Sequence, residues 1–264
     1  MSVIYVPNIP VAELTRCIPD WIPFNALTFV PIDNSWFLKK IEKHNLAFYL
    51  TYRRWHWKAF QVAKALHERK PFHGSHLVTL CSFREPGYMW KIGVPHIWGP
   101  LGGTHNFPMR FSKSIKFSSR WREWLRSKVN TFQLTHSLRI RWAMHRSAAV
   151  IAATSGAQSD FRRGLGIESD VELETGIDHE IRSHRLARDM ERPLRILWAG
   201  RLREWKGLPI LLHAIATLPK TVAVQLRVLG DGSSKKEWMK LASRPWTTKG
   251  FAISSRTIAG LKFQ

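Results

Sequence analysis

The stretch from residue 194 to residue 218 constrains the fold of this chain more than any other. Its first part, Leu194-Arg195-Ile196-Leu197-Trp198-Ala199-Gly200, is an apolar run closed by glycine, which predicts a buried strand. Gly207-Leu208-Pro209 then opens an apolar-periodic segment, which predicts a helix as far as Leu218. A strand that feeds directly into a helix is the repeating unit of a parallel sheet, so we predict an α/β fold.

The loop between this strand and helix carries two cations, Arg201 and Lys206. In a parallel α/β sheet, ligands bind at the carboxyl ends of the strands, where a helix N-terminus adds partial positive charge. Arginine holds a phosphate with two donors, and lysine adds a mobile point charge. The loop therefore predicts an anion site, although two such cations on an isolated loop are more often solvated surface charges.

Four short segments occur in the order found in one enzyme family. They are Trp98-Gly99-Pro100-Leu101-Gly102-Gly103-Thr104, then Glu174-Thr175-Gly176-Ile177-Asp178, then Gly-Arg-x4-Lys-Gly from Gly200 to Gly207, and Gly230-Asp231-Gly232. Together they resemble the motifs of the family 4 glycosyltransferases, which have the GT-B fold. The resemblance covers residues 27 to 243.

The resemblance implies a GT-B-like fold with two Rossmann-like lobes and parallel sheets, both incomplete in this chain. It implies a retaining, metal-independent glycosyltransferase of the hexosyltransferase type, which moves a sugar from a UDP- or GDP-sugar to a glycan or lipid-linked acceptor. The donor diphosphate would be held by Arg201 and Lys206, and four glycines would line the cleft: Gly102, Gly103, Gly200 and Gly230. The nucleotide-sugar is a substrate, so no cofactor is expected.

The catalytic residues stay unknown at this stage. Family members carry a Glu-x7-Glu pair after the Gly-Asp-Gly turn, and no such pair follows Gly232 here. The chain also has no Asp-x-Asp motif, so no metal site is predicted. His76 and His105 could titrate near neutral pH, but a lone histidine is more often structural.

We expect four regions along the chain. An N-terminal, acceptor-side lobe covers 1–178, a linker 179–193, and a partial nucleotide-sugar-binding lobe 194–243. Residues 244–264 show no period and no acidic residue, so we expect a non-native or disordered tail and a chain that is a fragment with reduced or no activity.

The elements of the first lobe follow from local patterns. Prolines interrupt residues 1–35, where only the segment 26–30 predicts a strand, so we expect the first strand and glycine loop of the lobe to be missing. Apolar residues at intervals of three and four predict a helix over 46–66, and buried strands are predicted at 76–81 and 94–98.

Charge is the strongest bulk signal. The 264 residues carry a formal net charge of +22, which favours binding to polyanionic partners. Residues 110–146 hold many cations with Trp121, Trp124 and Trp142 among them, which fits equally an anionic membrane surface and a pair of solvated helices. No motif for a specific nucleic acid is present.

Cys17 and Cys81 form no disulfide framework and are expected to be buried small hydrophobes. This cysteine usage suits a cytoplasmic protein. The basic surface makes peripheral attachment to the inner membrane face a further expectation. The alternative to the enzyme is a non-catalytic basic protein that binds an anionic membrane or a nucleotide.

Overall fold

A computed structural model describes residues 2–7, 18, 22–23, 27–32, 45–78, 80–115, 117–176, 193–219 and 221–242. The chain divides into two compact units. The first contains residues 1–105 and 128–176, and the second contains 106–127 and 177–264. Most of the predicted linker and the whole predicted tail lie outside the described residues, so both predictions stay open.

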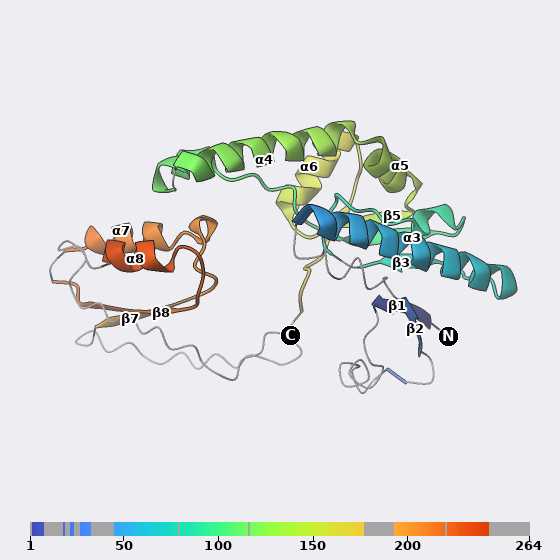
Figure 1. The fold of residues 1–264 in the computed structure, drawn as a ribbon, viewed down its shortest axis with the longest axis horizontal. Coiled ribbons are helices and arrows are strands. Elements are labelled where there is room, and N and C mark those ends of the chain that lie inside the picture. The colour runs from blue at the N-terminus through green and yellow to red at the C-terminus, as the bar shows by residue number, and fades with distance from the viewer. Residues whose placement is uncertain are drawn as a thin grey trace. The chain divides into compact units, whose positions relative to one another are not determined.

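The first unit is built on a four-stranded sheet. Its strands are β3 (Ser75–Leu77), β4 (His96–Leu101), β5 (Ala149–Ala152) and β6 (Asp170–Val171). They pair in the order β3-β4-β5-β6, and every pairing is parallel (Figure 1). The carboxyl ends of these strands therefore lie along one edge, where ligands of α/β proteins bind.

A separate parallel pair precedes this sheet, formed by β1 (Ser2–Pro7) and β2 (Leu27–Ile32). The prediction that the lobe lacks its first strand was therefore wrong. The short run of β-branched and aromatic residues before Pro7 is a good strand by propensity, and its proline stands at the last position of the strand, where it is tolerated.

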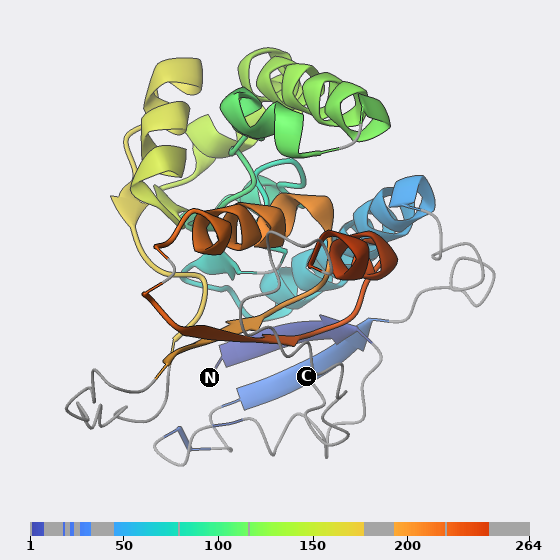
Figure 2. The same cartoon turned by 90° about the vertical axis from the view of Figure 1, so that its left-hand side faces the viewer.

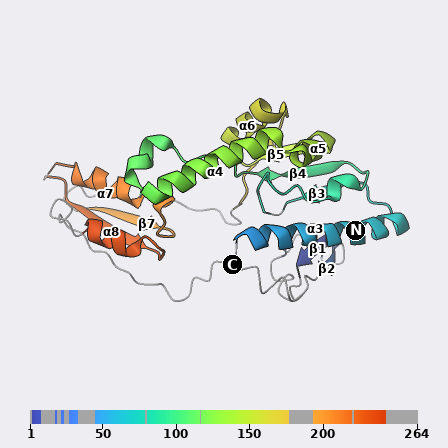
Figure 3. The same cartoon turned by 45° about the horizontal axis from the view of Figure 1, so that its top comes forward.

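The helices of the first unit are amphipathic, as their sequences predict. They are α3 (Asn45–Arg69), α5 (Leu138–Arg146) and α6 (Ser155–Leu165), with α4 (Phe117–His136) crossing from the second unit into the first. A short 3-10 helix occupies Met89–Lys91 (η2) in the first unit, and another occupies Met109–Ser114 (η3) in the second. Figure 3 shows α3 between the β1–β2 pair and β3, with α5 and α6 on the other side of the sheet.

The main core of the first unit joins its sheet to α4, α5 and α6. It contains the fully buried Trp98, Phe83, Phe161 and Met144. A second cluster places Trp55, Ala59 and Ala63 of α3 against Ile32, and the Trp55 indole donates to the Ile32 carbonyl at 3.0 Å. These contacts hold α3 against β2.

A buried carboxylate ties three segments of the first unit together. Glu85, whose side chain is 4% exposed, accepts hydrogen bonds from Arg53 of α3 and Arg139 of α5, each at 2.8 Å. Nearby, Arg84 donates to the amide oxygen of the buried Asn130 at 2.6 Å, and the Asn130 amide donates to the Thr104 carbonyl at 2.7 Å. The first unit therefore uses its buried polar side chains as crosslinks.

The second unit contains one βαβ segment and its following helix. The strands β7 (Leu194–Ala199) and β8 (Val224–Leu229) pair in parallel over six residues. The helices α7 (Leu208–Ala216) and α8 (Lys235–Ala242) pack on one face of the pair (Figure 2). Alternate residues of β8, Val224, Leu226 and Val228, face this core, while Gln225 and Arg227 between them are exposed.

The α/β class with parallel sheets is confirmed, and several element bounds need correction. The strand predicted over 76–81 is limited to β3, because the chain turns at Leu80 and Cys81, both with positive φ. Conversely, β4 begins at His96 and runs on to Leu101, three residues beyond the predicted end at residue 98. Cys81 is half-buried and free rather than buried, and Cys17 lies outside the described residues.

Within the described part of the chain, no helix combines the length and hydropathy that crossing a bilayer requires.

Candidate functional site

The loop after β7 is held to the loop after β8 by backbone hydrogen bonds. The Gly200 N–H donates to the Leu229 carbonyl at 3.0 Å, and the Leu202 N–H donates to the Asp231 carbonyl at 2.9 Å. The Ser234 N–H in turn donates to the Leu202 carbonyl at 3.0 Å. The carboxyl end of this parallel pair is therefore a defined surface with main-chain geometry fixed on both sides.

Arg201 and Lys206 lie on this surface and are exposed. Arg201 is the second residue after β7, and Lys206 ends the 3-10 helix η4 (Glu204–Lys206), which follows in the same loop. Among the described residues neither side chain has an ion-pair partner. Since no internal carboxylate neutralises them, both cations are available to an anion from solution.

The helix after the loop adds to the positive potential. Gly207 adopts a left-handed conformation, φ 72°, which turns the chain from η4 into α7, and no side chain caps the N-terminus of α7. An uncapped helix N-terminus favours negative charge near its first turn. Lys206 stands immediately before this turn.

Gly230 lets the two loops approach each other. Its φ is 146°, and a Cβ at this position would fall on the carbonyl oxygen of Gly200. Only glycine allows the two main chains to come this close. Two of the four glycines assigned to the cleft, Gly200 and Gly230, therefore meet in space at the carboxyl ends of β7 and β8.

Asp231 stabilises the loop that follows β8. Its carboxylate accepts from the Gly232 N–H at 2.9 Å and lies 3.5 Å from the Lys235 ammonium. The Gly232 N–H, helped by Lys235, holds the pKa of Asp231 below its ordinary value. The residue is thus a fixed negative charge within the turn.

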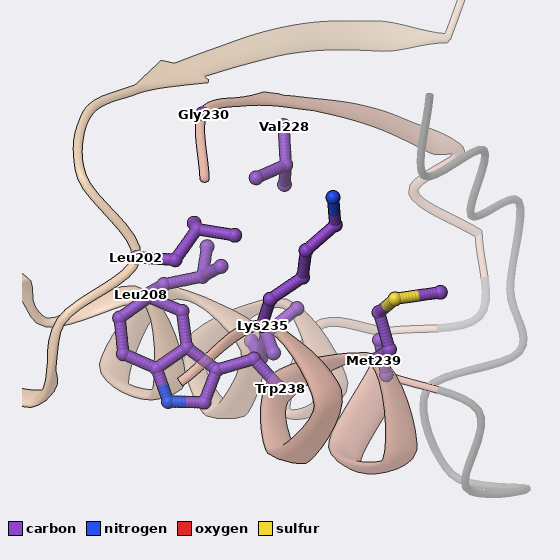
Figure 4. Close-up of a pocket in the computed structure, with 9 residues that line it drawn as sticks. Leu202, Leu208, Val228, Gly230, Lys235, Trp238 and Met239 are labelled. Atoms are coloured by element: carbon purple, nitrogen blue, oxygen red, sulfur yellow. The ribbon is translucent and has the colours of Figure 1, made fainter. Parts of the chain in front are cut away.

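A small cavity lies beneath this surface, and it is not the binding site. Figure 4 shows Leu202, Leu208, Val228 and Trp238 around it, with the Lys235 side chain at its border. Its volume is about 20 Å³, which is the space of one water molecule, and its lining is apolar. We interpret it as a packing void between the helices and β8.

Sequence reasoning missed Trp205 and Arg203 in the same loop. The Trp205 side chain is 54% exposed, and the Arg203 guanidinium lies 5.3 Å from its ring centroid. This exposed aromatic ring with a cation over it offers a flat apolar surface in the loop that also carries Arg201 and Lys206. The sequence held one indication of this: Trp205 lies in a predicted loop, where burial in the core would not explain a tryptophan.

In the first unit, the Gly102-Gly103 loop lies at the carboxyl end of β4. The Gly102 N–H donates to the Cys81 carbonyl at 2.9 Å, and Gly103 has φ 80°. A Cβ on Gly102 would stand 2.6 Å from a carboxylate oxygen of Glu174, which follows β6. The loop is therefore surrounded by groups from the ends of three strands.

His105 and Thr154 complete this edge of the sheet. The His105 Nε2 lies 3.1 Å from the Thr154 hydroxyl, which also caps α6 by accepting from the Ala157 N–H at 3.1 Å. His76 instead lies at β3, where its Nε2 is 3.0 Å from the Gly99 carbonyl. Sequence analysis named both histidines without a partner. It missed Glu174 and Thr154 as parts of the edge.

Two further histidines are buried and play no part in either edge. Burial lowers the pKa of His56 and that of His96 to about 4. The Nδ1 of His96 lies 2.8 Å from the Ser75 hydroxyl, and the Nε2 atoms of both rings are buried without a partner in the described structure. Both rings are therefore neutral at pH 7.

Within the described residues, no group of three or more histidine, cysteine, aspartate or glutamate side chains is placed to hold a metal ion.

Comparison with known proteins places the fold. No protein-family model and no curated protein matches the sequence. Among solved structures, the chain resembles the apo form of the lipopolysaccharide outer core galactosyltransferase WaaB, with a TM-score of 0.52 and 14% sequence identity. The match covers 91% of this chain and 57% of the WaaB chain. The fold is therefore GT-B-like, and the chain spans little more than half the length of the structure it resembles.

Proposed function

We propose that this chain is a family 4 glycosyltransferase of the retaining, metal-independent type. The donor is a UDP- or GDP-sugar, and the acceptor is a glycan or a lipid-linked sugar. The single observation that carries the proposal is the pair of unpaired, exposed cations, Arg201 and Lys206, on a loop fixed by backbone hydrogen bonds at the carboxyl ends of β7 and β8.

The proposed chemistry follows from the charge that develops as the sugar leaves its donor. Departure of a nucleoside diphosphate concentrates negative charge on the phosphate oxygens, and fixed cations stabilise that charge best when the loop is already in place. Arg201 would bind two phosphate oxygens in parallel, and Lys206 would add charge beside the N-terminus of α7. In this scheme the two side chains supply the charge that other glycosyltransferases take from a metal ion.

The acceptor would meet the edge formed by the first unit. The Gly102-Gly103 loop lies beside Glu174, and Glu174, His105 and Thr154 supply hydrogen-bonding groups at this edge. Such groups bind sugar hydroxyls in general and do not select one sugar. The identity of the donor base is likewise a matter for the experiment.

Calorimetric titration with UDP and with GDP tests the donor site. We expect one of them to bind, and we expect Arg201→Ala to weaken binding by at least about tenfold because a charge-assisted bond is lost. Lys206→Ala should weaken it by roughly fivefold. The matched control is Arg227→Ala, which removes an exposed cation from β8 of the same unit and should change nothing.

Turnover separates an enzyme from a protein that only binds. Any hydrolysis or transfer of the sugar from the preferred donor, which is expected to be reduced or absent in this chain, should be insensitive to excess EDTA and disappear in the Arg201→Ala variant. If well-folded protein binds neither nucleotide, or if Arg227→Ala weakens binding as much as Arg201→Ala, then the donor site assigned here is wrong.

A further inference from the structure

The solvent-facing side of α4 carries a row of large apolar side chains. Phe117 is 82% exposed, Trp121 60%, Leu125 48% and Phe132 63%. Their spacing of four, four and seven residues places them on one face of the helix. We name these four residues the aromatic stripe. An exposed apolar face of this kind on a globular protein marks an interaction site.

The orientation of the stripe is fixed by the opposite face of the same helix. Asn130 and Leu134 are buried against the first unit, where Asn130 bonds both Arg84 and the Thr104 carbonyl. Ser119 is also buried on that side. The helix therefore cannot turn the stripe inward without breaking these contacts, and Figure 3 shows α4 as one continuous rod.

Basic side chains flank the stripe on both sides. Arg120 and Arg122 lie on either side of Trp121 around the helix, and Arg126 follows one turn later. The only acidic residue of α4, Glu123, is already bonded to Arg126 at 2.8 Å. The helix thus combines an apolar row with an excess of positive charge, which is the composition of helices that lie in the headgroup region of a membrane.

The exposed tryptophans of α4 and α5 also fit a helix surface that lies at a membrane interface. The Trp121 and Trp124 rings stack with centroids 4.9 Å apart, on the side of the helix away from the core. The next helix repeats the pattern on a smaller scale, since Leu138 and Trp142 of α5 are 61% and 55% exposed and lie one turn apart. Indole rings concentrate at membrane interfaces because they are apolar bodies with one polar group.

We propose that α4 binds the surface of bilayers that contain anionic phospholipid, with the aromatic stripe inserted at the level of the headgroups. Charge complementarity selects this partner. A second copy of the chain would bring Arg120, Arg122 and Arg126 against their own equivalents, and like charges in contact disfavour that association. An anionic membrane instead meets both the apolar row and the arginines. The proposal does not depend on the donor site.

Flotation with vesicles measures this binding without any donor or acceptor. The full chain is mixed with vesicles of phosphatidylcholine or of equimolar phosphatidylcholine and phosphatidylglycerol, at low and high salt. We expect flotation with the anionic vesicles only, weakened by salt because exposed charges are screened.

Two sets of variants separate the apolar and the charged parts. The double variant Phe117→Ser with Trp121→Ser should lower the partition coefficient more than about tenfold, because both apolar side chains leave the interface. Phe132→Ser, at the other end of the stripe, should act in the same direction. Arg120→Gln with Arg122→Gln should weaken partitioning by roughly fivefold for each charge and reduce its salt dependence.

Leu50→Ser is the matched control, since Leu50 is 60% exposed on another helix, α3, and should leave flotation unchanged. The replaced side chains are exposed except for that of Arg120, which is half-buried, so circular dichroism and thermal unfolding are measured for every variant and should match the unaltered chain. Absence of flotation with anionic vesicles would overturn the proposal. So would unaltered flotation of the stripe variants, or a stripe-dependent dimer or nucleic-acid complex in a chain that ignores vesicles.

Discussion

The two units of this chain are held together in different ways. In the first, buried polar side chains crosslink separate elements: Glu85 joins α3 to α5, and Asn130 joins α4 to the segment after β4. In the second, an apolar core and close main-chain contacts do this work, and two loop cations, Arg201 and Lys206, have no ion-pair partner among the described residues. Buried ion pairs crosslink the first unit, whereas these two cations of the second unit stay exposed.

The difference suggests how an α/β unit prepares an anion site. A cation that already has a buried carboxylate partner, such as Arg139, is not available to a ligand. Arg201 and Lys206 keep their charge available because their loop is held by main-chain hydrogen bonds and a glycine contact, which consume no side-chain charge. We therefore expect substitutions in the two units to differ in their effects on stability and on nucleotide binding.

The largest effect is expected from Gly230→Ala. The new methyl group would overlap the Gly200 carbonyl, in a backbone conformation that L-residues rarely adopt. We expect a loss of about 4 kcal/mol in the stability of the second unit, from backbone strain and overpacking together. Hydrogen exchange followed by mass spectrometry should show faster exchange in β7 and β8 and unaltered exchange in β4 and β5.

The control is Gly93→Ala, which has φ 95° but open space around the added methyl group. It should show only the smaller cost of strain. Equal effects of the two variants would mean that the contact between Gly230 and Gly200 does not hold the second unit together.

The second-largest effect is expected from Glu85→Ala, which should destabilise the first unit instead of the second. Removal of the carboxylate leaves two arginines facing each other, and breaking a buried ion pair costs about 3 kcal/mol when, as for Arg53, one partner is half exposed. Urea unfolding should report this loss for the first unit, while binding of UDP or GDP stays unaltered. Glu168→Gln removes an exposed carboxylate that is also paired with an arginine, Arg162, and should have no measurable effect.

The third prediction concerns acid. In the folded chain the pKa values of His56 and His96 are about 4, below the ordinary value of 6.5, so the unfolded chain takes up protons first as the pH falls. The contribution of the two neutral rings to the stability of the fold is therefore present above about pH 6.5 and is lost as the pH falls towards 4. Between pH 7 and about pH 4.5, each histidine should cost the first unit about 2 kcal/mol.

Urea unfolding over this pH range tests the assignment. His96→Gln should reduce the acid-induced loss by about half, because one of the two buried rings no longer accepts a proton. A pH profile that is the same in the variant and the unaltered chain would show that the buried histidines are not its cause.

Local patterns predicted most elements of the fold. The strand β7, the helix α7 and the parallel pairing with β8 follow from an apolar run, a glycine and a periodic segment, all within about 35 residues. Local signals failed where the partner is distant in sequence. The strand β1 was missed because prolines interrupt residues 1–35 and because its parallel pairing with β2, a strand that was itself predicted, is not visible in the sequence.

The candidate site was predictable in part for the same reason. The positions of Arg201, Lys206, Gly200 and Gly230 at the carboxyl ends of β7 and β8 were predictable because they depend on residue type and on place in a strand-loop-helix unit. Glu174 was not recognisable as a neighbour of Gly102, since the two meet only when β4, β5 and β6 pair. Side chains brought together by sheet order carry no signature in the linear sequence.

The smallest predicted effect compares the helix N-termini of the two units. Thr154 caps α6 through its hydroxyl, whereas the N-terminus of α7 has no side-chain cap. Thr154→Ala should therefore destabilise the first unit by about 1 kcal/mol and free His105 from its hydroxyl partner, without altering nucleotide binding. Thermal unfolding and calorimetry measure the two quantities.

Ser159→Ala is the matched control, because Ser159 lies on the same helix and its exposed hydroxyl bonds only the carbonyl of the preceding turn. It should cost nothing. If Thr154→Ala weakened binding of UDP or GDP, the separation between a crosslinked first unit and a ligand-ready second unit would fail, because a cap in one would then govern the anion site of the other. If it changed stability alone, the uncapped end of α7 would stand out as the helix terminus reserved for a ligand.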